Sequence, residues 1–158
     1  MAESGVNLKV YQETLFQPNR RKALVVHTQM DTRIVLIKMF PGMSADLFRY
    51  QLSYPELKGV VLETYGSGNV TTEPWLAHCL KQVIKRGIPV VNITQCNGGG
   101  VDMGVYATSI HLKKMGVISG KDLTSEAALT KMMYLLGQEI GARSFKTLFE
   151  TAIRGEMA

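Results

Sequence analysis

Two loops carry the residues best suited to chemistry, and each loop directly follows a strongly apolar run. The first is Tyr65-Gly-Ser-Gly-Asn69, which precedes a helix-like pattern. Its glycines would let the backbone approach a ligand, and free N–H groups at a helix start attract anions. A dinucleotide-binding loop needs a third glycine three positions after Gly68, where Thr71 stands. The loop therefore favours a tight turn that presents Asn69 and Tyr65 over a nucleotide site.

The second loop is Thr94-Gln95-Cys96-Asn97, which leads into three consecutive glycines. A cysteine after a strand acts as a nucleophile only where a neighbouring base or positive charge makes it a thiolate. The histidines of the chain lie outside both loops: His27, His78 and His111. A Cys96–His pair is therefore disfavoured, and we expect Cys96 to be a small polar residue of a pocket.

Other reactive arrangements are absent from the sequence. There is no Gly-x-Ser-x-Gly elbow for a serine nucleophile. Cys79 and Cys96 lack CxxC spacing, which disfavours both a zinc site and a disulfide framework. Most of the 9 methionines fall on apolar faces, where packing explains them better than a soft metal does. The residues alone predict a binding-competent α/β domain with no metal site and no obvious catalytic set.

Alternating strand and helix patterns must position these loops. Continuous apolar runs predict buried strands over 33–40, 58–64 and 88–94, with a short fourth strand at 117–118. Helical spacing and capping residues predict helices over 44–52, from 72 to the glycine at 87, over 103–115, from the cap at 124 to about 136, and over 144–153.

This alternation predicts a three-layer α/β/α fold, a doubly wound (Rossmann/flavodoxin-like) parallel sheet of about four strands. Right-handed crossovers would place loops 40–43, 65–71 and 95–100 at one end of the sheet. A ligand is expected there, where the strand order reverses. We assign residues 33–158 to this domain and residues 1–32 to a linker or edge segment, with short strands possible at 6–10 and 23–26.

Composition narrows the class of protein. The 158 residues suit one globular domain, with 46% hydrophobic and 20% charged residues. The net charge is +5, and the basic residues are scattered along the chain. The one basic run, Arg20-Arg21-Lys22, is more typical of a solvated face or tail than of a nucleic-acid patch. No apolar run suits a membrane span. Two unpaired cysteines fit a reducing compartment, so we expect a cytoplasmic protein.

Several motifs, in order and spacing, resemble the C-terminal domain of type I (cytoplasmic) L-asparaginases. The resemblance covers roughly residues 30–156. The matching stretches are Gly59–Asn69, Pro89–Cys96, Tyr106–Thr108, Gly116–Ile118, Asp122–Thr124, Glu126–Lys131, Tyr134–Leu136 and Arg154–Glu156.

The resemblance implies an enzyme that hydrolyses L-asparagine to L-aspartate and ammonia without a cofactor. In this family a threonine forms an acyl-enzyme, and the protein is a homotetramer built as a dimer of dimers. The catalytic threonines, aspartate and lysine belong to an N-terminal domain with Gly-Gly-Thr-Ile-like and Gly-Thr-Asp-Thr-like motifs. Neither motif occurs here, and Met30-Asp31-Thr32 offers only an Asp-Thr pair in another context. No catalytic residue is therefore expected in this chain, which should be inactive alone.

The resemblance also implies roles for particular residues. Asn69 matches an asparagine that this domain lends to the active site of a neighbouring subunit. Thr94 and Cys96 match residues that line an allosteric L-asparagine pocket in some members. An arginine two positions before Tyr65 also contacts that effector, and Glu63 stands there instead. A carboxylate cannot clamp the effector carboxylate as a guanidinium does. The expected partners are L-asparagine, the N-terminal catalytic domain and further copies of the chain, as a dimer or tetramer.

Other functions are also compatible with the sequence. The chain could be a stand-alone module that binds a small amino acid or amide. It could be the corresponding domain of an amidotransferase that supplies ammonia for charging tRNA. A chemistry that depends on Cys96 is a further alternative.

Overall fold

The computed structural model describes residues 2–4, 6–12, 15, 17, 21, 23–104 and 107–158. Its centre is a parallel sheet of 4 strands in the order β3-β4-β5-β6. The strands are β3 (Ile34–Lys38), β4 (Gly59–Thr64), β5 (Val90–Thr94) and β6 (Ile118–Ser119). All four predicted strands are present, and β4 and β5 are buried along their whole length. This burial on both faces explains why their sequences are almost continuously apolar.

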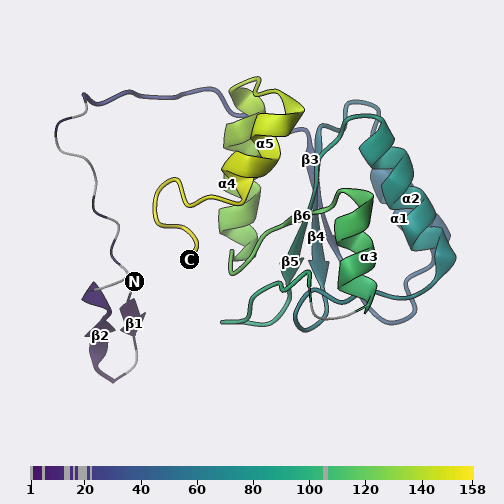
Figure 1. Ribbon diagram of the computed structural model, residues 1–158, viewed down its shortest axis with the longest axis horizontal. Coiled ribbons are helices and arrows are strands. Elements are labelled where there is room, and N and C mark those ends of the chain that lie inside the picture. The colour runs from purple at the N-terminus through teal and green to yellow at the C-terminus, as the bar shows by residue number, and fades with distance from the viewer. Residues whose placement is uncertain are drawn as a thin grey trace.

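Helices cover both faces of the sheet, which confirms the predicted three-layer fold (Figure 1). On one face lie α1 (Ala45–Leu52), α2 (Pro74–Lys85) and α3 (Ala107–Met115). On the other lie α4 (Ser125–Gly137) and α5 (Ala142–Phe149). Right-handed crossovers between successive parallel strands place the first three helices together.

The strand order corrects one expectation. Each described strand pairs with the strand that precedes or follows it in the chain, so this sheet contains no reversal of strand order. The predicted site at a reversal therefore has no counterpart among the described strands. The loops after β3, β4 and β5 still gather at the carboxyl end of the sheet, because all the strands are parallel (Figure 1).

Two helix starts agree with the sequence prediction, and those of α2, α3 and α5 differ from it. Ser44 Oγ accepts the Leu47 N–H at the start of α1, and Thr124 Oγ1 accepts the Ala127 N–H at the start of α4. Helix α2 begins at its proline, two residues after the predicted Thr72, because a proline suits the first helical turn. Helix α3 begins at 107, not at 103, because the Asp102 carboxylate accepts the Gly104 N–H and holds a turn there.

The last helix is also shorter than predicted at its C-terminal end. Helix α5 runs over Ala142–Phe149, so it starts two residues earlier and ends four residues earlier than the predicted 144–153. The chain turns back because the Glu156 carboxylate accepts the N–H groups of Ile153 and Arg154. The C-terminal residues consequently pack against α4 (Figure 1).

The first two strands of the chain lie apart from the three layers (Figure 1). They form an antiparallel pair, β1 (Ala2–Ser4) with β2 (Leu8–Val10), of which the sequence predicted only the second strand. Residues 23–26 are extended but pair with no strand in the described parts of the chain, and Leu24 is 90% exposed. Of the basic run, residues 20 and 22 lie outside the described residues. The boundary between the predicted linker, residues 1–32, and the predicted domain, residues 33–158, stays a prediction.

Packing supports one further sequence expectation. Cys79 is buried in the core beneath α1–α3, as its place on the apolar stripe of α2 predicts. None of the described helices has both the length and the apolar character that crossing a bilayer requires.

Candidate functional site

The β4–α2 loop is a tight turn, as the sequence predicts. The Tyr65 N–H donates to the Asn69 carbonyl at 2.9 Å, and the Asn69 N–H donates back to the Tyr65 carbonyl at 2.8 Å. Gly66 and Gly68 have φ values of +49° and +104°, which side-chain-bearing residues rarely adopt. A Cβ at Gly68 would also lie 2.8 Å from Val101. The two glycines therefore close the turn and leave Asn69 at its end.

One side of the Asn69 side chain is fixed. Its Oδ1 accepts a hydrogen bond of 2.8 Å from the Thr108 hydroxyl on α3. Its Nδ2 has no hydrogen-bond partner among the described residues, and the side chain is only partly buried. The arrangement holds the amide in one orientation and leaves two N–H donors for a ligand or a neighbouring chain.

A buried polar network fastens this turn to the sheet. Asn92 on β5 is fully buried, and its Nδ2 donates to the Gly68 carbonyl at 3.1 Å. Its Oδ1 accepts from the Thr64 hydroxyl at 2.7 Å. Sequence reasoning missed Asn92 and Thr64, although one signal was available. They are uncharged polar residues within the buried apolar runs of β5 and β4, and buried polar groups need partners.

The predicted effector residues Thr94 and Cys96 lie together at the end of β5. The Thr94 hydroxyl accepts the Cys96 N–H at 3.0 Å and donates to the Gly66 carbonyl through a short hydrogen bond. Cys96 itself is exposed. Gln95 ties neighbouring strand ends together, because its Nε2 donates to the carbonyls of Met39 and Glu63 at 2.6 and 3.1 Å. The loop is thus built largely by side chains that bind backbone.

Glu63 and Thr94 lie on opposite faces of the sheet. Glu63 alternates with Leu62, which packs under α1–α3, and so points toward α4. Its Oε1 accepts a short hydrogen bond from the Ser125 hydroxyl at the start of α4, and its Oε2 lies 3.6 Å from Lys38 Nζ. The described residues thus bring Thr94 and Cys96 together but place Glu63 across the sheet.

Tyr65 lies neither with Thr94 and Cys96 nor with Glu63. It packs against the α1–α3 core and lines a cavity of about 450 Å³ with Met43 and Trp75. His78 is exposed on α2. Among the described residues, no cluster of three or more His, Cys, Asp or Glu side chains could hold a metal ion.

The fold and this asparagine-bearing turn define an α/β domain whose candidate site residues gather at the carboxyl end of a parallel sheet. Residues 33–149 match the Glutaminase/Asparaginase C-terminal domain family. The chain belongs to this family, which confirms the resemblance of its motifs to the C-terminal domain of L-asparaginases.

Several relatives match almost the whole chain. The 60 kDa lysophospholipase of Homo sapiens is 40% identical over 99% of this chain and 27% of its own length. L-asparaginase 1 of Escherichia coli K12 is 38% identical over 99% of this chain and 46% of its own length. The crystal structure of L-asparaginase I from Vibrio cholerae superposes with a TM-score of 0.86 at 38% identity, covering 99% of this chain and 47% of that one. The chain therefore spans about a quarter to a half of the proteins it matches.

Proposed function

We propose that this chain works as the C-terminal part of an L-asparaginase, an amidohydrolase that converts L-asparagine to L-aspartate and ammonia. An N-terminal domain would supply the threonine nucleophile, and no cofactor would be needed. The match to L-asparaginase 1 of Escherichia coli over 99% of the chain supports this proposal. The two free cysteines fit the reducing conditions of the cytoplasm.

Asn69 carries the proposal. Its Oδ1 is held by Thr108 while its Nδ2 is free of partners in the described chain. A donor fixed in this way can orient a substrate without losing conformational entropy when the substrate binds. In a homo-oligomer the amide would enter the active site of a neighbouring subunit and hold the charged α-carboxylate of L-asparagine. The chain would then contribute subunit contacts and one positioning residue, but no nucleophile.

A chimera tests this role directly. The chain would replace the matching C-terminal part of L-asparaginase 1 from Escherichia coli, and ammonia release from L-asparagine would be measured. We expect no release from the chain alone and clear release from the chimera. In the chimera, Asn69→Ala should lower kcat by about tenfold. Ser67→Ala serves as the control, because this neighbouring hydroxyl has no hydrogen bond among the described residues. Turnover by the chain alone, or full activity of the Asn69 variant, would contradict the proposal.

We also propose that an amino-acid effector binds weakly at Thr94 and Cys96 at the end of β5, whereas Glu63 and Tyr65, the other two residues expected in this pocket, lie in separate groups. Lys38, the cation nearest Glu63, is already within 3.6 Å of that carboxylate, and Ser125 binds the same group. Position 63 therefore provides no guanidinium to bind an effector carboxylate. Calorimetric titration of the chain with L-asparagine tests this pocket. We expect saturation only at millimolar concentrations or above, and micromolar binding would show that Glu63 does not impair recognition.

The amidotransferase alternative fits less well. One component of the glutamyl-tRNA(Gln) amidotransferase of Pyrococcus furiosus is 33% identical over 84% of the chain. L-asparaginase 1 of Escherichia coli and L-asparaginase I of Vibrio cholerae each match 99% of this chain, so their similarity extends into the N-terminal segment. This wider match favours the asparaginase interpretation. The stand-alone binding module would instead require tight binding of L-asparagine in the calorimetric titration.

A further inference from the structure

A cleft between α2 and α3 lies beside the Asn69 site and shares Thr108 with it, but most of its lining has no role in the proposed function. Its volume is about 630 Å³, within the range of small-molecule sites. Its apolar lining comes from both helices, with Leu76 and Ala77 from α2 and Leu112 and Met115 from α3. Leu76 and Leu112 are only 2% and 1% exposed, whereas Ala77 and Met115 are half-buried and face the opening. The cleft thus offers a strip of apolar surface that runs between two roughly parallel helices.

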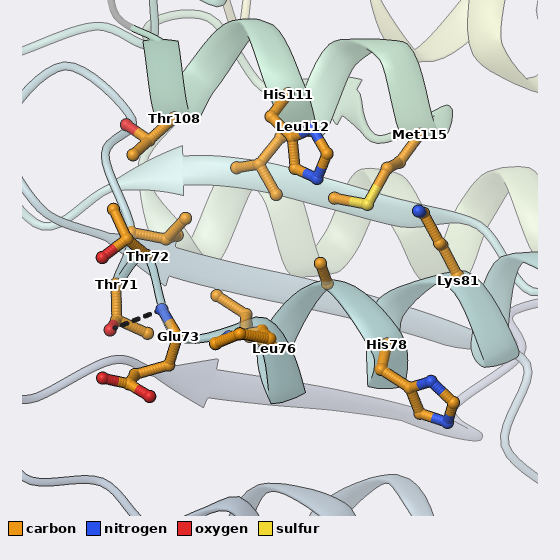
Figure 2. Close-up of a pocket in the computed structure, with 13 residues that line it drawn as sticks. Thr71, Thr72, Glu73, Leu76, His78, Lys81, Thr108, His111, Leu112 and Met115 are labelled. Carbon is orange, nitrogen blue, oxygen red and sulfur yellow. Dashed lines mark hydrogen bonds between the residues drawn. The ribbon is translucent and has the colours of Figure 1, made fainter.

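Three basic side chains line the same cleft. Lys81 and His78 come from α2, and His111 comes from α3. Figure 2 shows the Lys81 side chain extending toward Met115 and the His111 ring pointing into the space between the helices, while the His78 ring turns away from α3. None of these three has an ion pair or hydrogen bond among the described residues. Lys81 therefore places an unpaired positive charge beside apolar surface.

The end of the cleft away from Lys81 is polar and carries a negative charge. It carries the threonines Thr71, Thr72 and Thr108 and the one acidic lining residue, Glu73 (Figure 2). A ligand with a negative charge is consequently favoured at the Lys81 end and disfavoured at the Glu73 end. The cleft has a polarity along its length as well as an apolar lining.

We infer that this cleft binds a single-chain amphiphile with an anionic head group, of the long-chain carboxylate type. The alkyl chain would lie on Ala77 and Met115, above the buried Leu76 and Leu112, and the carboxylate would meet Lys81 and His111. Charge complementarity fixes the direction of the ligand, and the apolar lining supplies most of the affinity. Each methylene that enters the cleft should tighten binding about fourfold. This inference goes beyond the proposed asparaginase role and does not depend on it.

The test is a calorimetric titration of the purified chain with sodium dodecanoate below its micelle concentration. We expect saturable binding of one molecule per chain. Dodecyl maltoside has the same alkyl chain with a neutral head, and it should bind at least fivefold more weakly. Lys81→Gln should weaken dodecanoate binding by about five- to tenfold, because it removes a charge-assisted contact. Lys85→Gln is the matched control on an exposed position of the same helix, outside the cleft, and should change affinity by less than twofold.

A second variant tests the apolar lining. Ala77→Phe fills part of the cleft and should lower dodecanoate affinity about tenfold, with an unchanged circular dichroism spectrum as the check on folding. Backbone amide shifts in ¹H–¹⁵N spectra should concentrate on α2 and α3. Equal binding of the two amphiphiles, no effect of Lys81→Gln, or shifts confined to α4 and α5 would each overturn the inference.

Discussion

The Lys131 ammonium lies 2.5 Å from a carboxylate oxygen of Glu156, and this ion pair holds the C-terminal residues against α4. Lys131 is a buried lysine, with 6% of its surface exposed. Its Nζ also donates to the Thr151 carbonyl at 2.7 Å and lies 3.1 Å from Met157 Sδ. Buried ammonium groups are tolerated where such partners replace water.

The Glu156 pair predicts a loss of stability in acid. Burial raises the pKa of this carboxyl, but hydrogen bonds from Lys131 and from the Ile153 and Arg154 N–H groups outweigh it and lower the pKa from 4.5 to about 2. The stabilisation is therefore complete above pH 4.5 and disappears as pH falls toward 2. Glu156→Gln should flatten this decline and lower the free energy of unfolding at pH 7 by about 2 kcal/mol. Urea denaturation between pH 2 and pH 7 measures both effects, and parallel curves for the two proteins would contradict the assignment.

Removing the lysine should cost more than removing its partner. Lys131→Met leaves the Glu156 carboxylate and the Thr151 carbonyl without their buried cation, so we expect a loss of about 3 kcal/mol at pH 7. Lys114→Met on an exposed position of α3 is the control and should change stability by less than about 0.5 kcal/mol. Thermal unfolding monitored by circular dichroism compares the variants. Equal stability of the Lys131 variant and the control would show that the tail does not depend on this pair.

The Asn92 network should determine both stability and loop order. Asn92→Leu removes the donor to the Gly68 carbonyl and the acceptor for Thr64 Oγ1, so we expect a loss of about 2 kcal/mol. The β4–α2 turn should also exchange its amide protons faster, because its anchor to β5 is lost. Thr64→Val removes the second bond and the contact of the Thr64 hydroxyl with the Ile93 carbonyl, but it keeps the bond to Gly68 and serves as a milder comparison. Unchanged exchange at Asn69 in the Asn92 variant would refute the anchoring role.

The apolar stripe of α2 predicts a variant that cannot fold. Leu80 is completely buried beneath α1–α3, and Leu80→Asp would place a carboxylate there without a partner. We expect an unfolded or insoluble product in the circular dichroism spectrum. Gln82→Asp, on an exposed position of the same helix, should fold normally. A soluble, folded Leu80 variant would be incompatible with this core.

Features that depend on residues close together in sequence could be predicted from the sequence alone. The apolar run that became β4 and the cap at Thr124 needed no tertiary information, because burial pattern and capping are local properties. The Tyr65–Asn69 turn was equally evident from its glycines. The motifs within these elements also carried the family resemblance, so the fold class and the candidate asparagine followed from the sequence.

The remaining features of the fold and the site depend on contacts between residues far apart in sequence. The end of α5 depends on Glu156 finding Lys131, which lies 25 residues earlier. The orientation of Asn69 depends on Thr108, which lies 39 residues later on another helix. The cleft between Lys81 and His111 exists only because α2 and α3 pack side by side over the sheet. The consecutive strand order and the separation of Glu63 from Thr94 likewise come from how strands assemble. Local patterns cannot contain this information, because each of these features pairs groups that only folding brings together.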